Sequence, residues 1–248
     1  MLSSGIGATV ARMETRTSEI ADGIYQLTTY LAEIDFSLNQ YLVTADEPLL
    51  FHTGMRSLFP SVSGAVSRVV PLDALRWISF GHVEADECGS LNDWLRVAPH
   101  STPAQGMTGC MVSINDIADR EPRALADGEV LDIGGHRMRW IDTPHVPHSW
   151  EAGLLFDETT RTLFCGDLFS QWGPYPATTT DDIAARAIAD EDSSWMSLAP
   201  SSGAIIRRLA DLDVVTLAQM HGPAFTGDCR RALLDLADSF DKRIAAAS

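Results

Sequence analysis

The sequence has few basic residues and few cysteines, and it lacks long apolar runs. It carries 18 Lys+Arg against 34 Asp+Glu, which gives a formal net charge of −16. Phosphate backbones and anionic membrane surfaces repel such a chain, so we expect neither a nucleic-acid-binding protein nor a membrane-bound one. No apolar stretch approaches the roughly 18–20 residues of a membrane-spanning helix. No internal repeat or low-complexity linker divides the chain.

The four cysteines lie far apart and form neither a CxxC pair nor a dense disulfide framework: Cys88, Cys110, Cys165 and Cys229. We therefore expect reduced thiols in a cytoplasmic protein. The N-terminus lacks the basic start and the long apolar segment of a signal peptide. We expect residues 1–17 to be a flexible leader, with Met13 as an alternative start, and residues 18–248 to form a single domain.

Both halves of the chain contain short β-branched or aromatic runs, followed by segments with helical spacing. The expected strands are Ile24–Leu31, Gln40–Val43, Leu49–His52, Leu75–Phe80, Glu129–Ile133, Arg137–Ile141, Gly153–Phe156, Thr162–Phe164 and Val214–Leu217. The expected helices are Ser61–Val70, Gly89–Leu95, Asp181–Asp190, Ser202–Leu212 and Asp228–Ile244. Two β-rich halves that are each covered by helices indicate an α/β fold, a four-layer αββα sandwich.

Side chains that can bind metals follow directly after four of the expected strands. In the first case His82, Glu84 and Asp86 alternate in a loop. In an extended backbone, alternation places these three side chains on one side, where they converge. The alternative is a polar loop in which Asp86 or Ser90 caps the following helix.

The other three clusters are shorter. His145 and His148 lie in a proline-stiffened loop after Arg137–Ile141, and two histidines at this spacing favour a metal site over a structural role. Asp167 ends an apolar strand, where a carboxylate needs a cation or strong donors, although it could also cap the next segment. His221 follows Val214–Leu217, either as a ligand or as a core histidine in a turn.

Together the clusters supply three imidazoles and three carboxylates: His82, Glu84, Asp86, His148, Asp167 and His221. This number is sufficient for two metal ions that share one carboxylate. A nitrogen and oxygen ligand set without thiolate suits Fe or Mn, and also Zn, but not a Cys-rich structural zinc site.

The stretches GHVEADE, PHVPHSWEAGLLFDETTRTLFCGDLF and MHGPAF resemble the metallo-β-lactamase superfamily, and the resemblance spans Ile20 to Asp228. The chain most closely resembles the di-iron domain of flavodiiron proteins and their stand-alone oxygen-binding relatives. Hydrolases of the superfamily usually carry HxHxDH where flavodiiron proteins carry HxExDH. The chain has HVEADE, and Glu84 in place of the middle imidazole makes the site more iron-like.

The resemblance implies two iron ions, one held by His82, Glu84 and His148, the other by Asp86 and His221, with Asp167 bridging them. Glu87 stands where the family has a histidine ligand. Three possibilities follow: Glu87 is an extra ligand, the second iron has an open position, or His145 fills it.

His148 is the preferred ligand because it lies 19 positions before Asp167, a separation that resembles the family spacing. His145 would then support or gate the site without binding metal. We expect no flavodoxin domain and hence no FMN in this chain, so that electrons would come from another protein.

We therefore expect a non-haem di-iron protein that binds O2 or NO, either as a sensor or as a reductase that depends on a redox or signalling partner. A homodimer is compatible with this function. The alternative is a binuclear hydrolase of an ester, thioester or lactone, in which Asp86 orients a metal-bound water. A third possibility is a domain without catalysis that serves in assembly.

Aromatic residues and one thiol lie close in sequence to the expected site. The aromatic residues form an apolar wall for a small nonpolar gas, or else are ordinary core and surface side chains: Trp150, Phe169, Trp172 and Tyr175. Cys88 is either redox-active or a buried thiol at a helix start.

Overall fold

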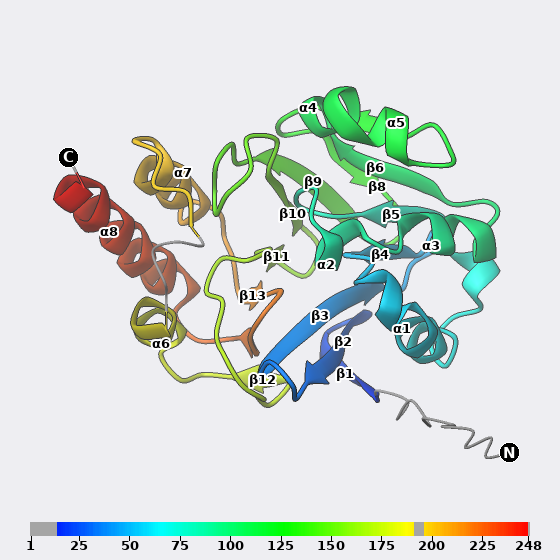
Figure 1. The fold of residues 1–248 in the computed structure, drawn as a ribbon, viewed down its shortest axis with the longest axis horizontal. Helices are drawn as coiled ribbons and strands as arrows, with labels where there is room; N and C mark the ends of the chain where they lie inside the picture. The colour runs from blue at the N-terminus through cyan, green and yellow to red at the C-terminus, as the bar shows by residue number, and fades with distance from the viewer. Residues whose placement is uncertain (1–13, 191–195, 248) are drawn as a thin grey trace, which may run out of the picture.

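The computed structural model describes residues 14–190 and 196–247, which form two mixed seven-stranded sheets with helices on their outer faces (Figure 1). The first sheet contains the strands β1 (Thr15–Ala21), β2 (Ile24–Leu31), β3 (Phe36–Val43), β4 (Leu49–Phe51), β5 (Trp77–Ser79), β6 (Thr102–Gly106) and β7 (Arg123–Leu125) in chain order. The second has the order β12 (Thr178–Thr179), β14 (Ala224–Phe225), β13 (Thr216–Ala218), β11 (Thr162–Phe164), β10 (Gly153–Asp157), β9 (Arg137–Asp142) and β8 (Val130–Asp132).

The helices fall between these strands along the chain. The α-helices are α1 (Phe59–Val66), α2 (Ala85–Cys88), α3 (Leu91–Val97), α4 (Met107–Gly109), α5 (Asn115–Ile117), α6 (Ile183–Asp190), α7 (Ser202–Leu209) and α8 (Cys229–Ala247). Short 3-10 turns cover Arg56–Leu58 and Leu72–Ala74, and a π-helical turn covers Cys110–Ile114.

Strand direction follows from the length of the connections. Strands β1 to β4 pair antiparallel through short turns, whereas β4 to β7 pair parallel and are joined by the helical crossovers. In the second sheet β8 to β11 form antiparallel hairpins, and β11 pairs parallel with β13 after the crossover that carries α6 and α7. As a result β9, β11 and β13 run in the same direction, and their carboxyl ends meet at one edge.

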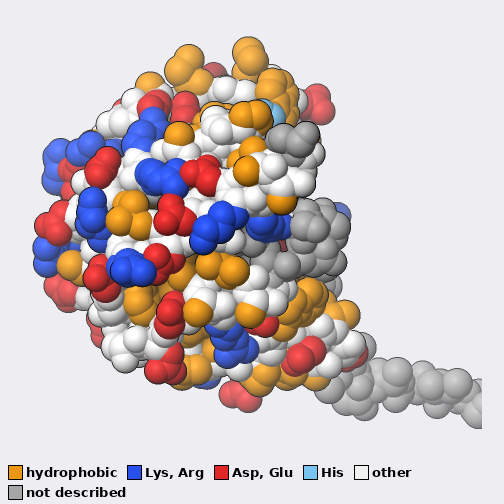
Figure 2. Space-filling model, turned by 90° about the vertical axis from the view of Figure 1, so that its left-hand side faces the viewer, with side chains coloured by type: hydrophobic (Ala, Val, Ile, Leu, Met, Phe, Trp, Pro, Cys, Tyr) orange, Lys and Arg blue, Asp and Glu red, His pale blue; other side chains and the backbone are white. Residues whose placement is uncertain are grey.

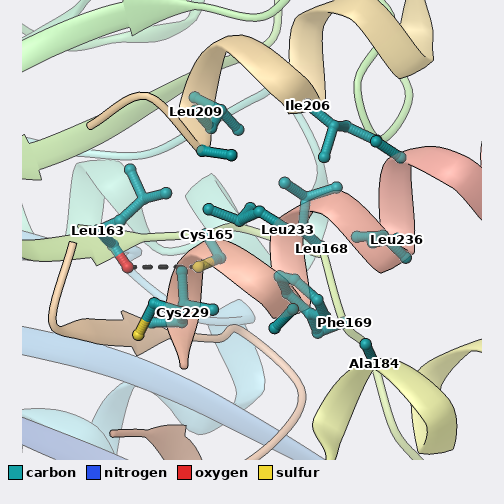
Figure 3. Packing of buried hydrophobic residues seen from close by; sticks show 14 of the residues in the cluster. Leu163, Cys165, Leu168, Phe169, Ala184, Ile206, Leu209, Cys229, Leu233 and Leu236 are labelled. Atoms are coloured by element: carbon teal, nitrogen blue, oxygen red, sulfur yellow. Dashed lines mark hydrogen bonds between the residues drawn. The ribbon is translucent and has the colours of Figure 1, made fainter. Parts of the chain in front are cut away.

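Three buried clusters separate the four layers. The first sheet packs on α1 and α3 through residues that include Leu50 and Trp94. The two sheets pack face to face through residues that include Phe51 and Trp140. The second sheet packs on α6, α7 and α8 around Leu233, as Figure 3 shows. These three interfaces confirm the predicted αββα sandwich.

The outer face over α6, α7 and α8 is strongly charged, with acidic and basic side chains interspersed (Figure 2). Arg207 of α7 pairs with Asp238 and Asp241 of α8, both at 2.6 Å. No helix in the described part of the chain combines the length and the apolar character required to cross a bilayer.

Several sequence expectations need correction. β1 begins at Thr15, so the end of the expected leader is part of a strand; residues 1–13 lie outside the described residues. The loop expected to carry His82, Glu84 and Asp86 contains the short helix α2, and the next helix begins at Leu91 rather than Gly89. The strand expected over Val214–Leu217 is shifted to Thr216–Ala218. Strands β1, β6, β7, β12 and β14 were not expected.

Candidate metal centre

The expected site residues meet at one edge of the sandwich, beyond the carboxyl ends of β5, β9, β11 and β13. A backbone hydrogen bond joins the two sheets at this edge, because the Gly153 amide donates to the Gly81 carbonyl at 2.9 Å. Layered α/β proteins commonly build sites at the carboxyl ends of their strands. The residues of the four clusters, far apart in sequence, therefore become neighbours.

Four of these residues form a compact group: His82, Glu84, His148 and Asp167. Nε2 of His82 lies 2.9 Å from Oε2 of Glu84 and 2.7 Å from Nε2 of His148. Nε2 of His148 lies 3.1 Å from the same Glu84 oxygen and 3.2 Å from Oδ2 of Asp167. Each residue thus directs one ligand-type atom to a common point.

The spacing suits a metal ion. Ligand atoms about 2.1 Å from one tetrahedral ion are about 3.4 Å apart. The separations that involve a histidine nitrogen run from 2.7 Å for the His82–His148 pair to 3.6 Å between Nε2 of His82 and Oδ2 of Asp167, and all four atoms lie within 4.8 Å of one another. We call this group of four the first position.

A second group adjoins the first through Asp167. Its Oδ1 lies 3.3 Å from Nε2 of His221, which is also 3.3 Å from Oδ2 of Asp86. The two oxygens of Asp167 thus face different groups. Oδ1 of Asp86 and Oδ1 of Asp167 are buried without a hydrogen-bond partner, the arrangement that a cation would satisfy. We call Asp86, Asp167 and His221 the second position.

The two buried histidines present Nε2 to the site. His221 places Nδ1 2.9 Å from the Ser37 carbonyl oxygen, which can only accept, so Nδ1 carries the proton. His82 places Nδ1 3.2 Å from Oε1 of Glu87. Partners of this kind fix the tautomer and orientation of metal-binding imidazoles.

The imidazoles and carboxylates of the site shift one another's pKa values. Hydrogen bonds from His148 and His82 lower the pKa of Glu84 to about 2. Burial alone would lower the pKa of His82, but Glu87 and Glu84 raise it to about 12. Burial would raise the pKa of Asp167, but the facing imidazoles of His148 and His221 hold it well below its usual range. The site therefore carries ionised carboxylates that attract cations.

Glu87 lies on the other side of His82. Its carboxylate is fully buried, accepts from the His82 amide at 2.7 Å, and lies 3.3 Å from Nε2 of His52. Burial would raise the pKa of Glu87, but the facing imidazoles hold it below its ordinary value. This position does not favour Glu87 as an additional metal ligand.

The roles expected for His145 and for the helix caps can also be compared with the geometry. His145 is exposed, with a left-handed φ of 66°, and its ring takes part in none of the ion pairs of either position. Neither α2 nor α3 has a side-chain cap, and the Ser90 hydroxyl donates to the Thr53 carbonyl instead. Asp86 lies in the first turn of α2, so it reaches the site from a helix and not from an alternating loop.

A cavity of about 110 Å³ opens beside both positions. Its lining includes Glu84, Asp86, His148, Asp167 and His221, together with the apolar side chains Phe36, Leu168, Phe169, Trp172, Ala187, Met196, Leu236 and Phe240. The Phe36 ring stacks on His221 at 4.2 Å and contacts Trp172 at 4.8 Å. Of the expected wall, Phe169 and Trp172 line the cavity; Trp150 is exposed and Tyr175 lies in the core.

The four cysteines lie in the interior of the protein. All four are free and buried. Cys88 ends α2 rather than starting a helix, and its thiol donates to the Glu84 carbonyl at 3.2 Å. Burial raises the pKa of Cys88 to about 12, so the reactive thiolate is scarce at neutral pH.

Two residues that support the site, His52 and Glu151, were not expected from the sequence. His52 follows β4 in the same manner as the expected ligands follow their strands, and that pattern could have identified it. Its left-handed φ of 64° and full burial indicate a position that the surrounding structure enforces. Glu151 accepts from the Val83 amide at 3.1 Å and so holds the loop that carries His82 and Glu84.

Comparison with known proteins identifies the family to which this chain is similar. A family model described as "ODP family beta lactamase" matches residues 36–222. A putative diflavin flavoprotein A 2 from Synechocystis sp. is 25% identical over 205 residues, which are 77% of this chain and 35% of the relative. The chain thus spans about a third of that relative's length.

Two solved structures share the fold. A metal-soaked Flv1 flavodiiron core from Synechocystis sp. superposes with a TM-score of 0.78 at 18% identity, over 94% of this chain and 62% of that one. Rubredoxin oxygen:oxidoreductase from Desulfovibrio gigas also gives 0.78, at 15% identity, over 91% of this chain and 62% of that one. At these identities the likeness shows the fold alone.

Proposed function

Because the chain belongs to the ODP family of beta-lactamase-fold proteins, we propose that it is a non-haem di-iron protein that binds O2, with NO as a second ligand of the same site. His82, Glu84 and His148 would hold one iron, Asp86 and His221 the other, and Asp167 would bridge them. Zn and Mn are the alternative metals for this nitrogen and oxygen set.

The observation that carries the proposal is the position of Glu84. Its Oε2 lies 2.9 Å from Nε2 of His82 and 3.1 Å from Nε2 of His148, so a carboxylate faces the point that those two imidazoles share. A hard oxygen ligand at this place favours iron over zinc relative to a third imidazole. Oδ2 of Asp167 faces His148 and Oδ1 faces His221, which supports Asp167 as a ligand shared by both ions.

The residues around the site would select the ligand. Two ferrous ions would supply the electrons that bound O2 accepts. Glu87 holds His82 in the orientation that presents Nε2, and the Ser37 carbonyl does the same for His221. The apolar side chains of the cavity would favour a small nonpolar molecule.

We propose further that a separate redox protein delivers electrons if the chain is a reductase, and that a signalling partner reads the ligated state if it is a sensor. The D. gigas relative of the fold is named for rubredoxin and oxygen, which supports a reductase with a protein donor. Mixing iron-loaded protein with reduced rubredoxin and O2 distinguishes the two, because only a reductase consumes more oxygen than its bound iron can reduce once.

The first test is metal content. We expect protein produced with iron and handled without air to contain iron at both positions, and Glu84→Gln to retain less. Glu158→Gln is the matched control because Glu158 lies in the β10–β11 turn, at the opposite end of the sheet. Zinc in place of iron, together with turnover of a model ester, would instead support the binuclear hydrolase.

A further inference from the structure

We propose that the two metal positions are unequal: the second position is filled after the first, binds its ion more weakly, and is the one that takes the exogenous ligand. This inference rests on the proposed function, because it concerns the same centre. It is carried by the ligand supply of each position, by the orientation of Glu87 and by the cavity.

The first position has a complete ligand set. Among residues 14–190 and 196–247, the group of three or more metal-type residues whose ligand atoms all lie within 4.8 Å of one another is His82, Glu84, His148 and Asp167. Four protein ligands around one ion are typical of closed sites. Asp86 and His221 do not belong to this group, and within the described residues they do not form a second group with Asp167 by the same distance.

The second position offers only Asp86, His221 and the remaining oxygen of Asp167. Three protein ligands with a vacant place are typical of sites that bind water or substrate. Oδ1 of Asp86 and Oδ1 of Asp167 are buried without a hydrogen-bond partner, so both stay available to an ion. With fewer protein ligands, the second position should release its ion more readily than the first.

Glu87 is next to Asp86 in sequence and could have completed the second position. It lies instead on the far side of His82, where Oε2 accepts from the His82 amide at 2.7 Å and Oε1 is at ion-pair distance, 3.2 Å, from Nδ1 of His82. Nε2 of His52 lies 3.3 Å from the same Oε1. Turning Glu87 toward the site would leave two buried imidazoles without their carboxylate, which is costly. The same carboxylate therefore strengthens the first position and leaves the second open.

The cavity gives an exogenous ligand access to the vacant place of the second position. It is lined by Asp86 and His221 but not by His82, and Phe36 covers the His221 ring. An exogenous ligand that enters through the cavity therefore meets the second position with its vacant place. The first position presents only Glu84, His148 and the shared Asp167 to the same space.

Cobalt(II) titration of the metal-free protein tests the inference without any oxygen chemistry. Visible absorption reports cobalt coordination, and azide serves as the exogenous probe. We expect two binding steps with dissociation constants that differ at least about tenfold, and an azide-induced spectral change that appears only with the second equivalent. Asp86→Asn should weaken the second step alone, Glu84→Gln should mainly weaken the first, and Glu158→Gln should change neither.

Each other outcome is decisive. Two equal steps, azide binding to the first equivalent, or an Asp86→Asn variant that weakens the first step would overturn the inference and leave the proposed function standing. Saturation at a single equivalent would overturn it too, because the second position would then not be a metal position. No cobalt binding at all would overturn the proposed function itself.

Discussion

Oε1 of Glu87 lies 3.2 Å from Nδ1 of His82, on the ring edge opposite the nitrogen that faces Glu84 and His148. The other Glu87 oxygen accepts from the His82 backbone amide at 2.7 Å. One buried carboxylate therefore contacts both the ring and the main chain of this residue. Carboxylate–histidine pairs of this kind raise the basicity of the ligating nitrogen and hold its orientation.

Replacing Glu87 tests this role. We expect Glu87→Gln to lower the affinity of the first position for cobalt or zinc by about 10–100-fold, because the neutral amide polarises His82 less than a carboxylate does. Competition with a chelator measures the affinity, and circular dichroism verifies the fold. Unchanged affinity in a folded variant would contradict the role, whereas Glu158→Gln should bind as the wild type does.

Narrowing the cavity should slow ligand binding without removing metal. Ala187 lines the cavity from α6 and is buried. Ala187→Leu adds three carbons to a space of about 110 Å³, so we expect slower O2 binding by stopped-flow absorption at unchanged iron content. Ala189→Leu adds the same atoms to an exposed position of that helix and should have no effect. Equal rates in both variants would show that the ligand enters elsewhere.

The contact between α8 and the second sheet should dominate stability on that side. Leu233 is fully buried among Cys165, Leu168 and Leu209 (Figure 3). We expect Leu233→Ala to lower the free energy of unfolding by about 2–5 kcal/mol, as measured by urea denaturation. Met111→Ala, at a side chain that is 71% exposed, should change it by less than about 0.5 kcal/mol. Similar losses in the two variants would argue against this packing.

A histidine–carboxylate pair far from the candidate ligands should give a pH-dependent contribution to stability. Nδ1 of His136 lies 2.8 Å from Oδ2 of the buried Asp157. The hydrogen bond to Asp157 raises the pKa of His136 above its ordinary 6.5. Burial would raise the pKa of Asp157, but the bonds from His136 and Thr160 lower it below 3.8.

The sign follows from these directions. Because the pKa of His136 is raised in the folded protein, its stabilising contribution is fully present below pH 6.5. The contribution is lost as the pH rises through the pKa of His136 in the folded state. A lowered aspartate pKa stabilises the fold above pH 3.8, and this is lost as pH falls. We therefore expect His136→Gln to lower the free energy of unfolding most between about pH 4 and 6.5, and less at pH 9. Urea denaturation of the metal-free protein measures this. A cost that does not vary with pH would refute the pair.

Much of the fold was predictable because burial enforces regular patterns. The segment Ile24–Leu31, rich in β-branched and aromatic residues, was expected as a strand and is β2 within the same bounds. The strand β6 was missed because its sequence TPAQG contains proline and glycine, and only its parallel neighbours β5 and β7 make it a strand. Tertiary pairing supplied what local sequence preference did not.

The candidate site was predictable in its members but not in its orientations. The pattern of a metal-type residue after a strand identified all six residues that the structure brings together. The direction of Glu87 could not follow from sequence, because it depends on where His52 lies after β4. Likewise, the two oxygens of Asp167 face different histidines only because the fold brings His148 and His221 to either side of it.

The most direct test of the central claim is oxygen uptake by protein loaded with iron(II) in the absence of air. On addition of O2, we predict consumption in proportion to bound iron, with a new visible absorption band, and a clear reduction of both in Glu84→Gln but not in Glu158→Gln. Oxygen uptake no greater than that of the zinc-loaded protein, with no spectral change, would contradict a di-iron oxygen-binding function.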